Sequence, residues 1–549
     1  MRHLPLILVL AVTVLVFGQV VTHDFLSWDD DVFLYQNPHT QPPTLESLKS
    51  YWTAPYAHLY APVTYTAWWT LARAFGHAGR GGAWVVAPPV YHAASLLTHL
   101  LVVTLAYLLL LRLVGSPWAA GVGAMLFAIH PLQVEAVAWA SELKDLLSGL
   151  FGLLAVLLYV RARQQQRLAP YLLATLAFVL AILSKPNLVA LPLLALVVDW
   201  LLLKTPARRA LLSVLPWLII AAAHTFLTRL VQPPSPALLL PLWQRLFVAG
   251  DSLAFYLEKL VLPVRLTADY GRMPGLVVSH WWGYVTWLAP AAVLALAIIT
   301  RRRSRWALPA FLWFSLALLP VLGLMPFDFQ QYSTVADHYA YLALFGPALA
   351  LAGLSLHLKT FYVRLPLVLV LVLLLAQSGL QTISWTSNLT FWQYTLQANP
   401  QSFLAHNNLG ATYQMRGQLP QAAEQFELAL RLQPEDPDTT VNLGLLKAQL
   451  GDEARAKELL EKGLQLRPGD PKALLMLGIM GVREKDYDSA ISHLQMLLEI
   501  QPQNVTARYQ LALALLQQGR KQEARSQLEE VLRQEPGFTA AAEALKHAK

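Results

Sequence analysis

The chain has 549 residues, of which 56% are hydrophobic and 13% charged, with a net charge of +8 and no cysteine. Its mean hydropathy is +0.44. This composition excludes an ordinary soluble protein and indicates several membrane spans. The lack of cysteine excludes disulfides, thiolate metal sites and cysteine nucleophiles.

The charges divide the chain into two parts. Residues 384–549 hold 17 Lys and Arg and 19 Asp and Glu, whereas the first 383 residues hold 24 basic and 14 acidic residues. The sequence therefore predicts a basic, apolar membrane part followed by a nearly neutral, soluble part. The net positive charge belongs to loops at a membrane surface, and no nucleic-acid partner is expected.

Eleven apolar segments approach the length of about 20 residues that a membrane-spanning helix needs. The first is too long for the core of a signal peptide and lacks a clear cleavage site, so we interpret it as an uncleaved span. The segments lie near residues 4–22, 90–111, 117–134, 146–160, 169–184, 187–203, 210–230, 281–300, 306–324, 339–357 and 365–383.

Short basic connections set the predicted orientation, because cytoplasmic loops are enriched in Lys and Arg. They place the N-terminus in the cytoplasm and residues 384–549 outside. Residues 242–263 carry Asp251 and Glu258 on one helical face, and we interpret them as an interfacial amphipathic helix. The connections hold Arg2, Arg112, Arg161, Arg163, Arg167, Lys204, Arg208, Arg209, Arg301, Arg302, Arg303, Arg305, Lys359 and Arg364.

The soluble part repeats with a period of 34 residues. Small residues recur at two fixed positions of each repeat, where they allow paired helices to approach, and a proline ends each second helix. This is the tetratricopeptide pattern. It predicts a linker and a leading helix over 384–402, four repeats over 403–538 and a capping helix over 539–549. The recurring residues are Pro400, Pro434, Pro468, Pro502 and Pro536; Gly410, Gly444, Gly478 and Ala512; and Ala422, Ala456, Ala490 and Ala524.

Tetratricopeptide arrays present a concave surface that binds a peptide or another protein. The sixth position of the repeats carries Asn408, Asn442, Met476 and Gln510. The three amides could bind a peptide backbone, or they could be generic residues of the repeat.

Three acids, Asp29, Asp30 and Asp31, follow the first span. They could be a solvated flank of that span. They also lie between Trp28 and Phe33, and a carboxylate held near an apolar surface has a raised pKa and can act as a base. Adjacent aspartates can bind a metal ion, but no calcium-loop motif follows them.

Further candidate residues lie in other predicted outer loops. Lys144 and Lys185 could contact a phosphate, or could reach the membrane surface along their own alkyl chains. The spacing of His130 and Glu135 does not suit a zinc site. Motifs for nucleotide hydrolysis, dehydrogenases and serine hydrolases are absent from the sequence. The remaining candidates are Asp145, Asp337, His338 and Tyr339.

Several motifs together resemble a family. FLSWDDDVFLYQNP, HPLQVEAVAWASELKDLLSGL, LSKPN, DHYAYLALFG and the 34-residue repeats occur in this order. The combination resembles membrane glycosyltransferases of the GT-C class fused to tetratricopeptide repeats, including the transmembrane and tetratricopeptide repeat-containing O-mannosyltransferases. The resemblance extends over nearly the whole chain. It implies an all-α membrane bundle, in a bacterial inner membrane, followed by an α-solenoid on the periplasmic side.

The resemblance also implies an activity. A sugar, such as mannose, passes with inversion from a polyprenyl-phosphate donor to a hydroxyl of a protein acceptor outside the cytoplasm, and the repeats hold the acceptor. The catalytic pair of the family falls on Asp29 and Asp30, with Asp31 extra. The candidates for substrate and phosphate binding are His130, Glu135, Lys144, Asp145, Lys185, Asp337, His338 and Tyr339.

Two motifs depart from related bacterial sequences. The chain has Ser141-Glu142-Leu143-Lys144-Asp145 in place of S-E-R-K-D, and Asp337-His338-Tyr339 in place of D-R-Y. Each change removes an arginine that could contact a phosphate. No cofactor is expected, although a divalent metal is compatible with the sequence. The alternative function is a non-catalytic scaffold whose repeats assemble envelope proteins. A transporter would need ionisable residues deep within its spans.

Overall fold

The computed structural model describes residues 3–79, 84–232, 240–357 and 361–548. Arg2 and Lys359, which contribute to the predicted cytoplasmic face, lie outside these ranges. The chain forms two compact units, Met1–Pro400 and Gln401–Lys549. Most of the segment predicted as a linker, residues 384–402, therefore belongs to the first unit.

The first unit is helical apart from one short hairpin. The hairpin pairs β1 (His77–Ala78) with β2 (Trp84–Val85) in antiparallel register. The α-helices are α1 (Leu4–Phe17), α2 (Leu45–Thr53), α3 (Pro62–Phe75), α4 (Pro88–Val114), α5 (Pro117–Ile129), α6 (Val134–Ala138), α7 (Leu143–Gln165), α8 (Leu168–Ser184), α9 (Leu191–Val197), α10 (Ala207–Val231), α11 (Leu242–Val261), α12 (Pro274–Ser279), α13 (Leu288–Thr300), α14 (Ala307–Leu318), α15 (Phe345–Ser355), α16 (Phe361–Ile383) and α17 (Asn388–Ala398).

Six helical segments in the described part of the chain are long and apolar enough to cross a membrane, or seven if the bent pair Pro117–Ile129 and Pro131–Ala138 is one span. The other four predicted positions hold shorter apolar helices, Leu168–Ser184, Pro186–Leu202, Ala307–Val321 and Phe345–Ser355. Helix α11 is not among the candidate spans, as the sequence predicted. The polytopic helical fold is confirmed, and the count of eleven spans and its orientation stay predictions.

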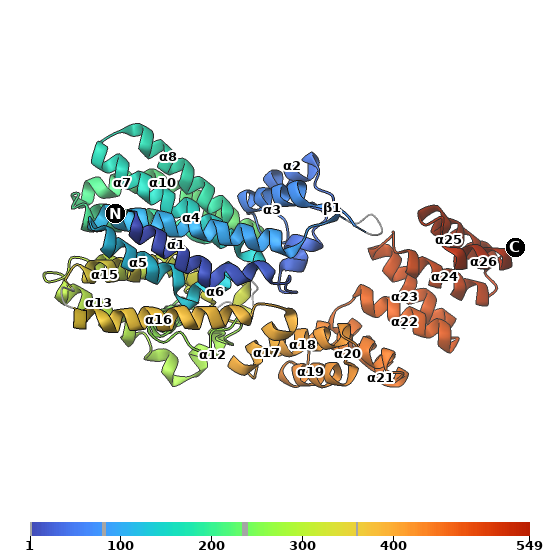
Figure 1. Ribbon diagram of the computed structural model, residues 1–549. Helices are drawn as coiled ribbons and strands as arrows, with labels where there is room; N and C mark the ends of the chain where they lie inside the picture. The colour runs from blue at the N-terminus through green and yellow to red at the C-terminus, as the bar shows by residue number, and fades with distance from the viewer. Residues whose placement is uncertain (1–2, 80–83, 233–239, 358–360, 549) are drawn as a thin grey trace. The chain divides into compact units, whose positions relative to one another are not determined.

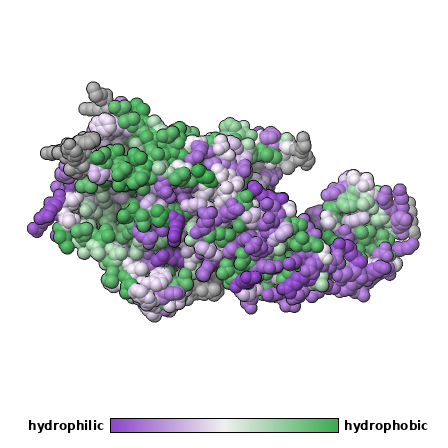
Figure 2. Space-filling view, turned by 60° about the horizontal axis from the view of Figure 1, so that its bottom comes forward, coloured by the Kyte–Doolittle hydropathy of each residue, from purple (hydrophilic) through white to green (hydrophobic). Residues whose placement is uncertain are grey.

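Large aliphatic side chains on these helices face outward. Leu172, Ile219 and Leu369 are each more than half exposed. A soluble protein rarely exposes so continuous an apolar surface, and here it faces lipid. Hydrophobic residues accordingly dominate the visible face of the first unit, whereas hydrophilic residues gather over the repeats (Figure 2).

Close helix contacts in the membrane unit depend on small residues. Figure 1 shows α1, α4, α5 and α16 running side by side, and α7 packs between α4 and α8. A Cβ added to Gly123 of α5 would lie 2.5 Å from the carbonyl oxygen of Ala348 in α15. Small residues at such crossings allow the helix backbones to approach, which is how membrane helices gain packing energy.

Residues 31–75, which belong to the first predicted outer loop, fold as a small helical layer beside the bundle. Thr44 and Ser47 form a capping box that starts α2, which satisfies otherwise unpaired amides at the helix start. Rings of Phe33, Tyr51, Tyr65 and Trp68 pack together in its core. This aromatic core holds the acidic stretch in place.

The second unit confirms the predicted repeats. Its helices form consecutive antiparallel pairs, with one more helix at the end. They are α18 (Phe403–Met415), α19 (Leu419–Leu432), α20 (Pro437–Gln449), α21 (Glu453–Leu466), α22 (Pro471–Glu484), α23 (Tyr487–Ile500), α24 (Val505–Gln517), α25 (Lys521–Gln534) and α26 (Thr539–His547).

Glycines at the eighth repeat position lie where paired helices touch. A Cβ on Gly410 would lie 2.7 Å from the Phe426 ring, and one on Gly478 would lie 2.6 Å from Leu494. The predicted reason for small residues at this position is therefore present in the structure.

Two of the repeat amides proposed to bind peptide already have partners inside the array. Asn408 Nδ2 donates to the carbonyl oxygen of Leu404 at 2.9 Å. Asn442 Nδ2 donates to Asn407 Oδ1 at 3.1 Å. A peptide would have to compete for these donors, which favours their interpretation as generic repeat residues. Gln510 is half-buried, and its role stays a prediction.

Candidate functional site

The acidic stretch gives its two candidate bases different environments. Asp30 is fully buried. Its Oδ2 accepts from the Leu26 amide at 2.9 Å. Its Oδ1 accepts from the Ser141 amide at 3.0 Å and from the Ser141 hydroxyl at 2.5 Å. Asp30 therefore fastens the outer segment to the turn before α7, and both of its oxygens are occupied.

Asp29 instead opens into a cavity, and its side chain is 46% exposed there. Its backbone has a φ of +72°, a left-handed conformation that aspartate tolerates better than most residues. Its Oδ2 lies 3.7 Å from Lys144 Nζ. Asp29 is thus the carboxylate of the pair that a substrate can reach, and Asp31 begins the next turn, Asp31–Tyr35.

Burial shifts the titration of both acids. It raises the pKa of Asp29, against the opposing effect of the Lys144 ammonium. It raises the pKa of Asp30 to about 7, although hydrogen bonds from Ser141 and Leu26 oppose the rise. A raised pKa makes a carboxylate a stronger base near neutral pH.

A chain of ion pairs continues from Asp29 along the start of α7. Lys144 Nζ lies 3.1 Å from Glu142 Oε1. Lys185 Nζ lies 2.9 Å from Glu142 Oε2 and 2.6 Å from Asp145 Oδ2. Glu142 is 1% exposed, so this network is shielded from bulk water. Both lysines are therefore already neutralised by carboxylates.

His338 adds a neutral ring to the same region. Its Nδ1 lies 2.8 Å from Glu135 Oε1, and Glu135 Oε2 accepts from the Asp337 amide at 3.0 Å. Burial lowers the pKa of His338 well below its usual value. Because the ring is neutral at pH 7, His338 does not supply the charge of the arginine that related bacterial sequences carry at this position.

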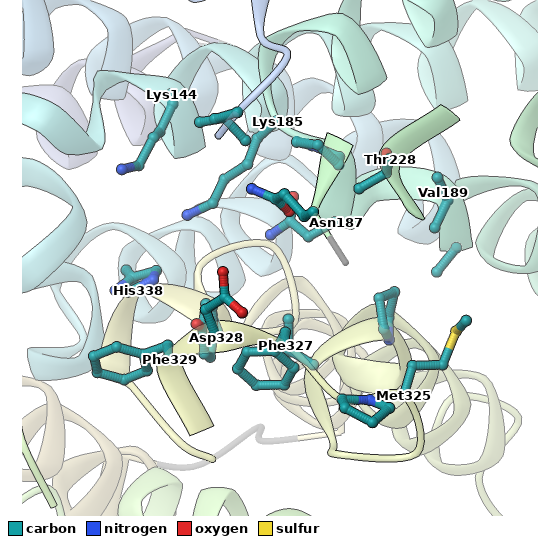
Figure 3. A pocket seen from close by; sticks show the side chains of 18 of the residues that line it. Lys144, Lys185, Asn187, Val189, Thr228, Met325, Phe327, Asp328, Phe329 and His338 are labelled. Carbon is teal, nitrogen blue, oxygen red and sulfur yellow. The ribbon is translucent and has the colours of Figure 1, made fainter. Parts of the chain in front are cut away.

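These groups line one cavity of about 850 Å³. Its walls include the polar residues Asp29, Glu135, Glu142, Lys144, Lys185, Arg229, Asp328, His338 and Tyr339 and the apolar residues Val189, Leu193, Leu319, Val321, Leu324 and Met325. Figure 3 shows Lys144, Lys185 and His338 apart from Val189 and Met325. The aromatic residues Trp28, Trp139, Phe327 and Phe329 complete the wall. The cavity is thus amphipathic, with a charged end and an apolar end.

Four predicted site residues, Asp30, His130, Asp145 and Asp337, do not line this cavity. His130 is buried, with Nε2 3.1 Å from the Leu260 carbonyl oxygen and Nδ1 3.2 Å from the Leu132 amide. Asp337 accepts from the Tyr270 hydroxyl at 2.7 Å. Both support the loops around the cavity and have no direct path to a ligand. Asp145 contacts the cavity wall through its ion pair with Lys185.

The segment before the repeats also touches the acidic turn. The Ser27 amide donates to Asn388 Oδ1 at 2.7 Å, and Asn388 Nδ2 donates to Ser27 Oγ at 3.2 Å. The rings of Trp28 and Trp392 meet edge to face with centroids 5.4 Å apart. Helix α17 therefore holds the two residues that precede Asp29.

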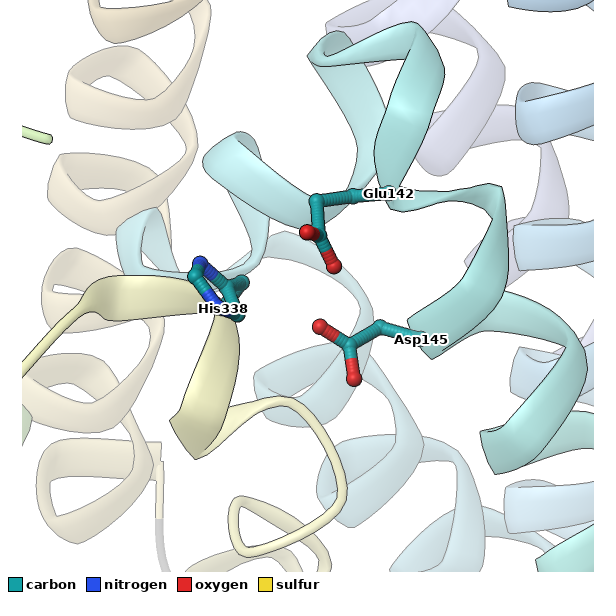
Figure 4. Close-up of side chains that lie close together, drawn as sticks. All are labelled: Glu142, Asp145 and His338. Atoms are coloured by element: carbon teal, nitrogen blue, oxygen red, sulfur yellow. The ribbon is translucent and has the colours of Figure 1, made fainter. Parts of the chain in front are cut away.

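Among the described residues, Glu142, Asp145 and His338 form a group that could hold a metal ion, with one ligand atom of each within 4.8 Å of the others (Figure 4). Lys185 already binds both carboxylates. A metal ion at this position would have to displace that ammonium. The donor set therefore fits a resident lysine better than a metal ion.

Sequence reasoning missed Glu142 and Arg229. Glu142 was visible within the SELKD motif, but its position between two lysines depends on the fold. Arg229 lies in the last turn of α10, where it resembles an ordinary membrane-flanking arginine, and nothing in the sequence links it to the cavity.

Comparison with known proteins supports two assignments. The family of dolichyl-phosphate-mannose-protein mannosyltransferases matches residues 85–231. Tetratricopeptide repeat families match residues 403–436, 441–505 and 482–548. The first match contains Lys144, Lys185 and Arg229, whereas Asp29 and His338 lie outside it. The resemblance inferred from the motifs is thereby confirmed. A search of curated proteins finds no match.

Solved structures resemble part of the chain. YrrB, described as a TPR protein with an unusual peptide-binding site, is 23% identical and covers 29% of this chain and 81% of its own, with a TM-score of 0.27. A MamA structure is 21% identical and covers 28% and 89%, with a TM-score of 0.26. MamA from Desulfovibrio magneticus RS-1 is 23% identical and covers 27% and 82%, with a TM-score of 0.26.

Proposed function

We propose that this membrane protein, in which a mannosyltransferase-family segment is joined to tetratricopeptide repeats, transfers a mannosyl residue from a polyprenyl-phosphate donor to a protein hydroxyl. Transfer takes place on the outer side of the membrane that the protein spans, at the boundary between lipid and water. The observation that carries the proposal is the amphipathic cavity, where Asp29 lies 3.7 Å from Lys144 at the charged end and aliphatic residues line the other end. A sugar joined to a lipid by a phosphate has the same succession of polar and apolar parts.

Asp29 is the proposed base. It accepts the proton of the acceptor hydroxyl, and the hydroxyl oxygen forms a bond to the anomeric carbon. The bond from that carbon to the phosphate oxygen breaks on the opposite face, so the configuration inverts and polyprenyl phosphate leaves with the bonding electrons. A positioned base contributes about 10²–10⁴-fold to such a rate.

Asp30 has a different role in this proposal. Because its two oxygens accept hydrogen bonds from Leu26 and Ser141, it positions the turn that carries Asp29. The family pair thus divides into one base and one positioning residue.

The repeats supply the acceptor. Tetratricopeptide arrays bind peptides and proteins on one face, and an acceptor held on the same chain reaches the cavity at an increased effective concentration. The family match supports a phosphate-linked donor and mannose as the sugar, and both are part of the proposal.

A non-catalytic scaffold would explain the repeats equally well. It gives no reason for a large cavity that gathers Asp29, Lys144, Lys185 and His338 from separate parts of the chain. We therefore favour transfer over scaffolding.

The test compares single variants in cells that lack the gene. Glycoproteomics of exported proteins is expected to show glycans lost on deletion and restored by the wild-type gene. Asp29→Asn should restore almost none of them, whereas Asp31→Asn, which changes an acid outside the cavity wall, should restore them fully. Restoration by Asp29→Asn at wild-type level would remove Asp29 as the base, and an unchanged glycoproteome on deletion would contradict the proposed function.

A further inference from the structure

Arg229 lies on a wall of the cavity that the proposed reaction has not yet used. It belongs to the last turn of α10. Thr225, Thr228, Arg229 and Gln232 all line the cavity, and their spacing of three, four and seven residues places them on one helical face. This face therefore forms one continuous side of the cavity.

Arg229 differs from the other two cations of the cavity wall. Lys144 is paired with Glu142 and Asp29, and Lys185 with Glu142 and Asp145. No carboxylate among the described residues lies within ion-pair distance of Arg229. The charge that is available to an anion is therefore on α10.

The charged end of the cavity offers an anion no ammonium group that is free of a carboxylate. Asp29, Glu135 and Glu142 line it together with two lysines, and Asp328 also lines the cavity. Asp145 lies behind Lys185. The carboxyl groups outnumber the ammonium groups, and His338 is neutral. A phosphate placed among them would meet lysines that are already paired.

The two hydroxyls on this face of α10 already donate within the helix, which leaves the Arg229 guanidinium and the neutral amide of Gln232 as side-chain donors of this wall. The hydroxyl of Thr225 donates to the Ala221 carbonyl oxygen at 2.8 Å, and that of Thr228 donates to the His224 carbonyl oxygen at 3.0 Å. A guanidinium presents several N–H groups in a planar fork that matches two phosphate oxygens.

We propose that Arg229 binds the phosphate of the lipid donor, and that the two lysines of the charged end do not provide the main contact. The inference rests on the proposed function and specifies where the donor lies. Thr228, the residue before Arg229, lies near Val189 and away from Lys144 in Figure 3. The phosphate then sits between the apolar end, which takes the polyprenyl chain, and the charged end, which takes the sugar beside Asp29.

Arg229 also compensates for the two arginines that the motifs of this chain lack. Where related sequences carry arginine in S-E-R-K-D and D-R-Y, this chain has Leu143 and His338. Of these two positions, His338 lines the cavity and Leu143 does not, and Arg229 supplies a guanidinium to that cavity from a different element.

The test measures binding to the purified full chain in nanodiscs. The probes are farnesyl phosphate, farnesol and inorganic phosphate. Arg229→Gln is expected to weaken farnesyl phosphate binding by about 10–100-fold, the value of a lost charge-assisted hydrogen bond, with farnesol binding unchanged. Arg229→Lys keeps the positive charge but loses the planar guanidinium, so its affinity for farnesyl phosphate should lie between those of the wild type and Arg229→Gln. Arg209→Gln, at the exposed first turn of the same helix, is the matched control and should bind as the wild type does.

The outcomes separate this inference from the proposed function. If the wild type binds farnesyl phosphate more tightly than farnesol and Arg229→Gln binds it equally well, the role of Arg229 is wrong and the donor class stands. If the wild type binds farnesyl phosphate no better than farnesol, the donor class itself is wrong. Tryptophan fluorescence of each variant confirms that the membrane unit is folded.

Discussion

The membrane unit and the repeat array use ion pairs of similar length in opposite surroundings. Lys144 and Glu142 lie 3.1 Å apart with side chains 8% and 1% exposed, whereas Arg467 and Asp438 lie 2.7 Å apart with side chains 45% and 58% exposed. Water screens the pair in the array, so each partner can be removed at little cost. In the membrane unit, the removal of one partner leaves a buried charge without its counterion.

The comparison indicates where each unit carries its function. Buried charges are costly, and in the described part of the membrane unit Asp29, Glu142, Lys144, Asp145 and Lys185 form a connected set at one cavity. Arg163–Asp199 and Arg272–Asp251 are separate pairs with a buried aspartate. The array spreads exposed pairs between its repeats, such as Lys447–Glu427 and Lys457–Glu484. Charge therefore marks a site in the first unit, whereas in the second it mainly supports solubility and the stacking of repeats.

The largest effect is expected for Glu142→Gln. It leaves Lys144 and Lys185 without their shared carboxylate, and the free energy of unfolding of the membrane unit should fall by about 3–5 kcal/mol. Chemical denaturation in detergent, followed by tryptophan fluorescence, measures this unit alone, because all 17 tryptophans precede residue 401. The control is Glu484→Gln in the array, which circular dichroism should show to cost less than about 1 kcal/mol. Equal losses in both units would contradict the comparison.

Asp30→Asn should destabilise the membrane unit by about 1–3 kcal/mol, because its new amide group faces the Leu26 N–H, which loses its acceptor. Asp29→Asn, at the accessible neighbour, should change the unfolding free energy by less than about 1 kcal/mol while it abolishes transfer. The same fluorescence titration measures both variants. A stable Asp30→Asn protein together with an unfolded Asp29→Asn protein would reverse the assigned roles.

Helix packing extends the comparison to uncharged residues. Gly123→Ala brings a Cβ against the backbone carbonyl oxygen of Ala348, whereas Gly410→Ala brings one against the Phe426 side chain. Overpacking costs about 1–3 kcal/mol, and a side chain can move aside more easily than a backbone. We expect Gly123→Ala at the upper end of this range and Gly410→Ala at the lower end, measured by fluorescence and by circular dichroism, respectively. The opposite order would show that the membrane helices yield more readily than the repeats.

The smallest effect concerns pH. Burial raises the pKa of Asp29 above 3.8. The transfer rate should therefore rise with pH as this carboxylate loses its proton. The pH at which the rate falls on the acid side should be higher than for a base with the pKa of an ordinary aspartate. In the array, hydrogen bonds from Arg533 and Gln534 lower the pKa of Glu530 to about 2. The stability that this acid contributes is present above its unfolded pKa of 4.5 and is lost only as the pH falls toward 2.

Transfer rates and far-UV circular dichroism over about pH 4–8 measure the two behaviours. At the acid end, the repeats should remain folded while transfer declines. Full transfer at an acid pH where an ordinary aspartate begins to protonate would contradict the role of Asp29 as a base with a raised pKa.

The repeats could be predicted almost completely from the sequence. Five prolines at one period, together with glycines such as Gly410 and Gly478, specify helix pairs whose contacts are all close in sequence. The apolar segments of the membrane unit were located equally well, because hydropathy alone determines them. The sequence does not predict how these segments pack against one another.

The site could be predicted only in part. Outer-loop acids and lysines were identified from their positions beside spans, and the structure brings Asp29 and Lys144 together across 115 residues of sequence. The sequence could not separate Asp29 from Asp30, since the difference depends on Ser141 and Leu26 as hydrogen-bond partners. It could not connect Arg229 to the cavity. The sequence of a helix predicts which residues share a face, but it does not predict what that face packs against.

The contacts of α17 with the acidic turn have a consequence for building hybrid proteins. Asn388 and Trp392 hold Ser27 and Trp28 in place, so the residues directly before the array are a structural component of the membrane unit and not only a linker. A different repeat array could be grafted onto this bundle only after Pro400. A graft made at residue 384, where the hydropathy of the chain changes, would remove the helix that supports the turn before Asp29, the proposed base.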